Sequence, residues 1–375
     1  MTIDFATLAP EGIRGLQPYQ PGKPVEELQR ELGLTDVVKL ASNENPLGAS
    51  PRVREAVAAA TEFERYPDGS AWVLKEQLSE HLHVPQDQLT IGNGSNDVLE
   101  LLGRVFLRPG TEAIVSEHAF VVYPLVTIAV GATLTPIPAR DFGQDLDATL
   151  AAIGESTRCV FIANPNNPTG TWLAESALRP FLDTVPPDVI VVLDEAYCEY
   201  VQEDGYPDGV ALTRDYPNLV VTRTFSKAYG LAALRVGYSI SNPVIADLMN
   251  RIRQPFNVNA LALAAASAAL SDQDHVRRSV AVNAEGLAYL ARECERLGLG
   301  YIPSVGNFLT IDMGQDAAPL YEALLRKGVI VRPIGGYGLP NHLRVTVGLA
   351  DENERLIAAL ETVLGAGAGP ADSQG

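Results

Sequence analysis

Residues 221–231 read VTRTFSKAYGL, and this stretch decides how the rest of the chain is interpreted. The apolar run 219–221 predicts a short buried strand, and Lys227 follows soon after its end. A side chain at the carboxyl end of a buried strand points into the crevice where α/β proteins bind ligands. A lysine that is desolvated there can lose its proton and attack carbonyl groups. The alternative is a solvated lysine beside a turn.

Short apolar runs alternate with helical patterns over residues 46–270. Strands are predicted at 89–91, 113–115, 134–137, 159–162, 189–193, 219–221 and 238–240. Helices are predicted from Ser50 onward and at 70–82, 96–106, 120–130, 174–185, 243–253 and 259–270. Continuous apolar strands that alternate with helices indicate a mostly parallel sheet covered on both faces. We therefore expect an α/β fold with a large domain over residues 46–270.

The pattern changes after residue 270. A helix is predicted near 276–297, followed by a small α+β unit with strands at 308–311, 329–331 and 343–347 and helices at 317–327 and 351–364. Residues 1–45 contain one helical pattern, 24–32, and an extended segment, 37–40. We expect residues 1–45 to fold with 271–364 as the smaller domain. The tail 365–375 is rich in Gly, Ala, Ser and Pro, which predicts disorder.

Composition excludes several classes of protein. The 375 residues carry a net charge of −18, which disfavours binding to nucleic acid or to an anionic membrane. Three scattered cysteines and five histidines form neither a disulfide framework nor a metal motif. No secretory signal and no membrane-length apolar run is visible, so we expect a cytoplasmic protein.

Two polar turns follow predicted strands. Residues 91–97 read IGNGSND, where Gly94, Ser95 and Asn96 open a helix whose amide groups favour a phosphate. Residues 164–170 read NPNNPTG, and their two prolines can hold the Asn167 amide rigidly. An ordinary capped turn remains the alternative for the first segment, and a purely structural turn for the second.

A carboxylate ends the most apolar strand. Residues 194–197 read DEAY, directly after the run 189–193. A carboxylate there is costly to bury unless it meets a cation, so Asp194 requires a positive partner, although a helix N-cap is the alternative. A nucleophilic lysine, a buried anion, rigid amide and phenol donors and a phosphate cradle are together what pyridoxal 5′-phosphate needs.

These motifs, with Arg235 eight residues after Lys227, resemble in order those of the fold-type I aminotransferases, in the branch that includes histidinol-phosphate aminotransferase. The resemblance covers almost the whole chain. It implies a seven-stranded, mostly parallel sheet between helices plus a smaller α+β domain. It also implies that Lys227 binds the cofactor covalently and moves a proton, and that Asp194 keeps the pyridine nitrogen protonated.

The same resemblance assigns the remaining cofactor contacts. Tyr197 and Asn167 are expected at the ring hydroxyl, and Phe120, in the segment EHAF, at the ring face. The cofactor phosphate is expected to contact Gly94, Ser95, Asn96, Thr224, Ser226 and Arg235. Tyr66 resembles a tyrosine that reaches the cofactor phosphate of the neighbouring subunit, which implies a homodimer.

Four further residues resemble substrate contacts: Asn43, Glu44, Arg332 and Arg344. The expected reaction moves an amino group between histidinol phosphate and 2-oxoglutarate in histidine biosynthesis. EHAF departs from the proline-containing segment common in this branch, which leaves an aromatic amino-acid aminotransferase open. A threonine-phosphate decarboxylase and a non-catalytic ligand-binding relative also remain open. For Arg332 a solvated surface charge, and for Asn43 and Glu44 a simple turn, remain possible.

Overall fold

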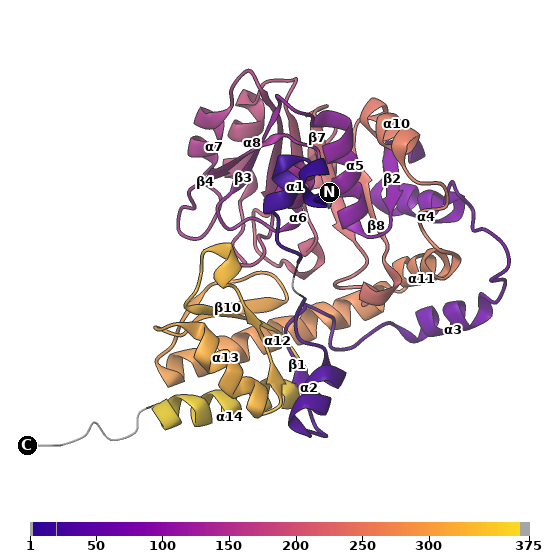
Figure 1. Cartoon of the computed structure of the whole chain (residues 1–375). Coiled ribbons are helices and arrows are strands. Elements are labelled where there is room, and N and C mark those ends of the chain that lie inside the picture. Colours follow the sequence, from indigo (N-terminus) through magenta and orange to yellow (C-terminus); the bar gives the residue numbers. More distant parts are fainter. Residues whose placement is uncertain (1–2, 20, 368–375) are drawn as a thin grey trace, which may run out of the picture.

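A seven-stranded sheet forms the centre of the larger part of the structure (Figure 1). The computed structural model describes residues 3–19 and 21–367. The strands lie in the order β2 (Leu89–Gly92), β8 (Gly237–Ile240), β7 (Leu219–Thr224), β6 (Ile190–Asp194), β5 (Thr157–Ala163), β3 (Glu112–Ser116) and β4 (Thr133–Ile137). Strand β8 runs antiparallel to the other six strands, which are parallel to one another. The predicted α/β fold with a mostly parallel seven-stranded sheet is confirmed.

Helices cover both faces of this sheet because its strands are apolar on both sides. In β6, Val191 and Leu193 belong to one hydrophobic cluster and Val192 belongs to the other. One face is covered by α5 (Ser95–Phe106), α6 (Val122–Ala129) and α10 (Pro243–Ile252). The other is covered by α4 (Trp72–Leu82), α8 (Glu175–Thr184), α9 (Gly209–Leu212) and α11 (Ala260–Leu270). Also in this part of the chain are α3 (Pro51–Ala59) and α7 (Leu146–Ala152).

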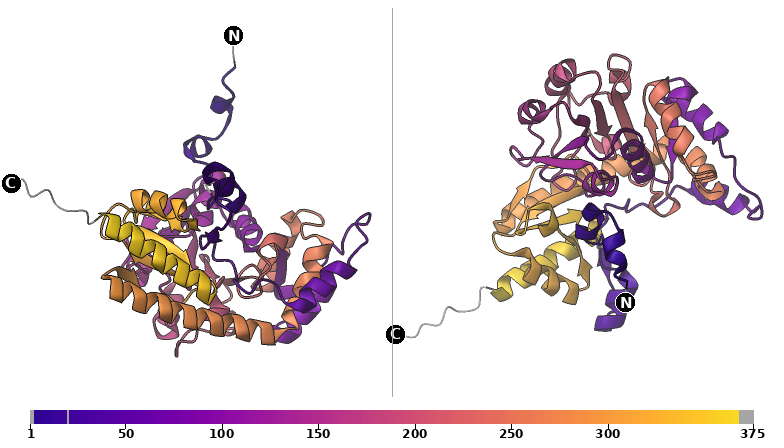
Figure 2. Two further views of the ribbon diagram at one scale, coloured as in Figure 1. Left: turned by 90° about the horizontal axis from the view of Figure 1, so that it is seen from below. Right: turned by 45° about the horizontal axis from the view of Figure 1, so that its top comes forward.

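A four-stranded antiparallel sheet forms the centre of the smaller unit, with strand order β12 (Arg332–Pro333), β13 (His342–Thr346), β10 (Phe308–Asp312) and β9 (Gly300–Ile302). It packs with α12 (Gln273–Leu297), α13 (Ala317–Arg326) and α14 (Ala350–Gly367). In Figure 2, α12 lies beside α14 at one end and approaches the helices of the larger unit at the other. The domain boundaries near 46 and 270 stay a prediction.

The N-terminal segment joins the smaller unit through β1 (Val38–Lys39), which pairs in parallel with β11 (Val329–Ile330). Before it come α1 (Glu11–Gly15) and α2 (Val25–Leu32). We did not predict α1, because glycines are poor helix formers. Gly12 packs closely on α6, where an added Cβ would lie 2.8 Å from Cγ2 of Ile128.

Other local predictions need correction. The strand predicted at 329–331 is β11, which pairs with β1, and a separate strand, β12, follows it and pairs with β13 instead. Strand β9 and helix α7 were not predicted, because both are short. Helix α14 extends to Gly367, three residues past the predicted end, and the rest of the predicted disordered tail lies outside the described residues. No helix within the described ranges is both long and apolar enough to cross a membrane.

A buried ion pair lies under the carboxyl edge of the large sheet. Nε and Nη2 of Arg223 both donate to Oε2 of Glu195, at 2.9 and 2.7 Å, and the Glu195 side chain is fully buried. The Glu195 backbone amide donates to the Thr222 carbonyl oxygen at 2.8 Å, which fixes Glu195 beside β7, the strand that carries Arg223.

We predict that Arg223→Met lowers the free energy of unfolding by about 3–5 kcal/mol, because it leaves a buried carboxylate without its cation. Urea unfolding followed by circular dichroism measures the loss. Arg251→Met is the control, since its pair with Asp247 is exposed and should contribute little. If both variants lost the same free energy of unfolding, the buried Arg223–Glu195 pair would contribute no more than an exposed pair.

Candidate active site

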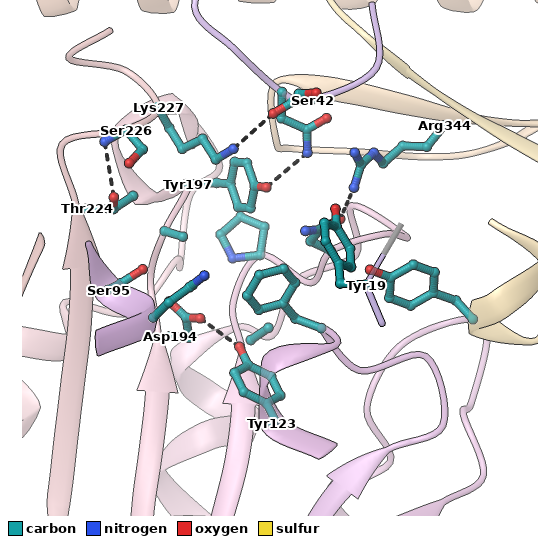
Figure 3. Close-up of a pocket in the computed structure, with 18 of the residues that line it drawn as sticks. Tyr19, Ser42, Ser95, Tyr123, Asp194, Tyr197, Thr224, Ser226, Lys227 and Arg344 are labelled. Atoms are coloured by element: carbon teal, nitrogen blue, oxygen red, sulfur yellow. Dashed lines mark hydrogen bonds between the residues drawn. The ribbon is translucent and has the colours of Figure 1, made fainter. Parts of the chain in front are cut away.

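A pocket lies at the carboxyl edge of the large sheet, where it faces the smaller unit (Figure 3). Strands β2, β5, β6 and β7 all end at this edge, because β8 reverses direction between β7 and β2. The pocket is lined by Tyr19, Ser42, Asn43, Ser95, Asn96, Phe120, Tyr123, Ala163, Pro165, Asn167, Asp194, Ala196, Tyr197, Thr224, Ser226, Lys227, Arg235, Tyr337 and Arg344.

One end of the pocket is a cradle for an anion. Helix α5 begins at Ser95, so its first amide groups point out of the helix toward the cradle. Nη1 of Arg235 contacts Oγ of Ser226 at 3.3 Å. Glycine is required here: a Cβ on Gly94, whose φ is +82°, would lie 2.5 Å from Nη2 of Arg235. These groups provide the amides, hydroxyls and positive charge that a phosphate dianion needs.

A buried carboxylate also lines the pocket. Asp194 is the last residue of β6, and its two oxygens accept from Tyr123 Oη at 2.7 Å and Thr222 Oγ1 at 2.9 Å (Figure 3). Burial raises the pKa of Asp194, and the two hydroxyl donors oppose that rise. Among the described residues Asp194 forms no salt bridge, so a cationic ring nitrogen would complete its environment.

Lys227 lies in the turn after β7, half-buried at the pocket wall, with Nζ 3.2 Å from the Ser42 carbonyl oxygen (Figure 3). Burial, together with the charge of Arg344, lowers the pKa of Lys227 to about 7. A substantial fraction of the amine is therefore neutral near pH 7 and can act as a nucleophile or a base.

The phenol of Tyr197 and the amide of Asn167 also line the pocket. Oη of Tyr197 accepts from Nδ2 of Asn43 at 2.9 Å, and burial raises the pKa of Tyr197 to about 12. The phenol therefore keeps its proton at neutral pH and can donate it to an anionic oxygen. Oδ1 of Asn167 accepts from Nη1 of Arg344 at 2.5 Å, which leaves the amide nitrogen of Asn167 to donate into the pocket.

Asn43 holds the segment that crosses between the two units. Its φ is +54°, which is unfavourable for a residue other than glycine. It is held there because its backbone amide donates to Thr346 of β13, its side-chain nitrogen donates to Tyr197, and its carbonyl accepts from Asn307. One buried asparagine thereby orients the phenol and fixes the smaller unit against the pocket.

Two arginines approach the pocket from the smaller unit. Arg344 on β13 pairs directly with Arg332 on β12 across the antiparallel ladder. Like charges opposite one another are unfavourable, so an anion between them would be stabilising. Nε of Arg344 is buried and has no hydrogen-bond partner within the described part of the chain. The guanidinium of Arg332 lies 5.2 Å from the ring centre of Tyr19, which lines the pocket.

The structure brings together most of the residues predicted from sequence. Phe120 lines the pocket and meets Tyr123 edge-on, with ring centres 5.8 Å apart. Four predicted residues are not in the lining. Gly94 is the N-cap of α5 and does not itself face the pocket. Arg332 packs on the ring of Tyr19, which separates it from the pocket. Glu44 is exposed and bound to Lys39 at 3.1 Å, and Tyr66 is 82% exposed.

Sequence reasoning missed several lining residues. Tyr123 lies in an apolar helical segment, and only its bond to Asp194 distinguishes it from a core tyrosine. Tyr19 and Tyr337 come from loops of the smaller unit, so no local pattern marks them. For Tyr337 the adjacent glycines 335, 336 and 338 were a usable signal, because they indicate a loop with unusual backbone angles.

The arrangement fits a small dianionic cofactor that carries an aldehyde and a basic ring nitrogen, as pyridoxal 5′-phosphate does. The anion cradle, which a Cβ on Gly94 would obstruct, suits the phosphate. The Asp194 carboxylate, which has no cationic partner among the described residues, suits the ring nitrogen. The amine of Lys227 suits the aldehyde. Within the described ranges no three His, Cys, Asp or Glu side chains gather to hold a metal ion.

Comparison with known proteins agrees with this chemistry. The family "Aminotransferase class I and II" matches residues 35–360. Histidinol-phosphate aminotransferase 2 of Pseudomonas fluorescens Pf0-1 is 57% identical over 98% of this chain and 100% of its own. Histidinol-phosphate aminotransferase 1 of Nitrosococcus oceani is 56% identical over 96% of this chain and 98% of its own.

A solved structure extends the comparison. Histidinol-phosphate aminotransferase from Sinorhizobium meliloti, in complex with pyridoxal-5′-phosphate, is 31% identical with a TM-score of 0.88, over 96% of this chain and 98% of its own. Aspartate aminotransferase from Thermus thermophilus with maleate, 22% identical with a TM-score of 0.79, shares the fold. The chain therefore belongs to the class I and II aminotransferases, in the branch of the histidinol-phosphate aminotransferases.

Proposed function

We propose that this chain is a pyridoxal-phosphate-dependent histidinol-phosphate aminotransferase that moves an amino group between histidinol phosphate and 2-oxoglutarate in histidine biosynthesis. One observation carries the proposal: a desolvated lysine, a buried carboxylate and a phosphate cradle share a pocket with Arg344, and Arg332 is paired with Arg344 on the neighbouring strand. The two arginines suit an anionic group at the far end of the substrate. A cytoplasmic location stays part of this proposal.

The cofactor, when bound, supplies an aldehyde that condenses with amines and a ring that accepts an electron pair. Ser95, Thr224, Ser226 and Arg235 bind its phosphate, with the first amide groups of α5. Asp194 holds the proton on the ring nitrogen. The phenol of Tyr197 and the amide nitrogen of Asn167 donate to the ring oxygen. Glu44, on present geometry, acts only if the N-terminal segment moves.

Lys227 performs the proton transfers. Its neutral amine can remove the proton from the substrate carbon that bears the amino group, because its lowered pKa leaves a substantial fraction of it unprotonated near pH 7. The Ser42 carbonyl oxygen, 3.2 Å from Nζ, orients the amine. Arg344 and Arg332 hold the substrate anion, with the phenol of Tyr19 beside Arg332.

The function is tested with pairs of substrates. Steady-state kcat/KM for histidinol phosphate with 2-oxoglutarate should exceed that for phenylalanine by at least roughly a factor of ten, since a phosphate dianion can bind both Arg344 and Arg332 whereas the carboxylate of phenylalanine carries a single charge. A tenfold preference for phenylalanine would establish the aromatic aminotransferase instead. Release of carbon dioxide without a keto acid would establish a decarboxylase.

A second test uses the pKa of Lys227. The rate at which the apoenzyme captures pyridoxal phosphate, followed by absorbance, should rise with pH through about 7 and then level off, because only the neutral amine attacks the aldehyde. Lys227→Ala is the matched control, which keeps the phosphate cradle but should form no covalent bond and show no turnover. A capture rate that still rises steeply near pH 10 would mean that burial does not lower this pKa.

The predicted homodimer is also part of the proposal. Tyr66 stacks on Phe256 at 4.6 Å and, with its ring exposed, does not reach the pocket of its own chain. Phe63 and Trp72, 76% and 57% exposed, come from the same stretch of sequence. Exposed aromatic groups near one another are typical of interfaces. This supports a contribution of Tyr66 to a neighbouring active site.

Mixing two inactive variants tests this contribution. Lys227→Ala and Tyr66→Ala should each be impaired alone. Refolded together at equal amounts they should recover about one quarter of wild-type activity, because half of the dimers are hybrids with one intact site. Native mass spectrometry of the refolded mixture, which separates the two variants by mass, shows whether hybrid dimers have formed. No recovery despite exchange would place Tyr66 outside the neighbouring site.

A further inference from the structure

A histidine joins the two units beside the pocket. His118 follows β3 in the loop that carries Phe120, and its side chain is buried, with 6% exposed. Its Nδ1 lies 2.7 Å from the carbonyl oxygen of Tyr337 in the smaller unit. Because a carbonyl oxygen only accepts, Nδ1 must carry the proton and donate.

Further contacts fix the His118 side of this hydrogen bond and the loop that accepts it. The carbonyl oxygen of His118 accepts from Nδ2 of Asn166 at 3.3 Å, and Asn166 belongs to the turn after β5. The imidazole ring lies against Gly338, where an added Cβ would be 3.6 Å from both Cε1 and Nδ1. The contact therefore connects the segment 117–120, the turn 164–170 and the loop 335–338.

A row of rings continues the contact into the smaller unit. Phe142 stacks with His118, with ring centres 6.4 Å apart, and meets His342 edge-on at 5.9 Å. His342 is the first residue of β13, and Arg344 follows two residues later on the same face of the strand. The row thus runs from the Phe120 loop to the strand that carries the buried arginine.

We propose that His118 is a positioning residue: by holding the Tyr337 carbonyl it fixes the loop 335–338, so that the Tyr337 side chain closes the pocket next to Arg344. This proposal rests on the proposed function in one respect: the anion that binds next to Arg344 is taken to be the phosphate of the substrate. His118 is not among the residues that line the pocket. Burial raises the pKa of Tyr337, and the charges of Arg344 and Arg332 oppose that rise, which agrees with their proximity.

Kinetics of two variants test the role. His118→Leu removes the donor at similar volume, whereas the amide nitrogen of His118→Asn lies as far along the side chain as Nδ1. We expect His118→Leu to raise KM for histidinol phosphate roughly three- to tenfold, the effect of one lost hydrogen bond, with kcat within about twofold. His118→Asn should restore most of the loss. An unchanged KM, or equal loss in both variants, overturns the proposal.

Hydrogen exchange gives an independent readout. The loop amides of Tyr337 and Gly338 bond to the carbonyl oxygens of Ile334 and Gly335 at 2.9 and 3.0 Å. In the cofactor-loaded His118→Leu enzyme the peptide covering 334–341 should exchange faster, whereas peptides from β6 should not change and His118→Asn should resemble wild type. Uniformly faster exchange, or none in this loop, shows a general structural role and refutes positioning.

The two readouts separate the two proposals. If the wild-type enzyme does not turn over histidinol phosphate, the proposed function fails, and the exchange measurement alone decides the role of His118. If turnover is normal but the loop and KM are unaffected in His118→Leu, the positioning role fails and the function stands.

Discussion

The alignment of β6 with β7 is the constraint on which the active site depends. Asp194 pairs in register with Thr222, so the threonine hydroxyl reaches the carboxylate and the chain leaves β7 on the side where Lys227 can enter the pocket. A slip of one residue would turn Asp194 to the other face of the sheet. Such a slip would be costly because the buried Asp194 carboxylate would lose its hydrogen bonds from Tyr123 and Thr222.

The electrostatics of the pocket oppose those of the whole chain. The net charge is −18, yet the pocket gathers Lys227, Arg235 and Arg344 around a single carboxylate. Nearby charges in a desolvated site outweigh distant solvated ones, because water screens the latter. The acidic surface therefore does not prevent the binding of an anionic cofactor or substrate. The arginines also add to the effect of burial in lowering the pKa of Lys227.

Local patterns were sufficient for much of the fold. The seven strands of the large sheet and the residues at their carboxyl ends were recognisable because buried parallel strands are short, apolar and followed by polar turns. The predictions failed where an element depends on distant partners. Strand β9, Gly300–Ile302, exists because it pairs with β10, and α1 tolerates two glycines because Gly12 meets Ile128 on α6.

The sequence by itself determined the chemistry: a lysine, an aspartate, a tyrosine and a phosphate-binding turn at strand ends, whose types and order identify the cofactor. Only the tertiary structure decided which other side chains complete the site. Tyr123 is joined to Asp194 across 71 residues and Arg344 to Asn167 across 177, and His118 holds the loop of Tyr337 across 219. Hydrogen bonds of this kind depend on how sheet, helices and loops pack in space, and no spacing along the chain encodes them.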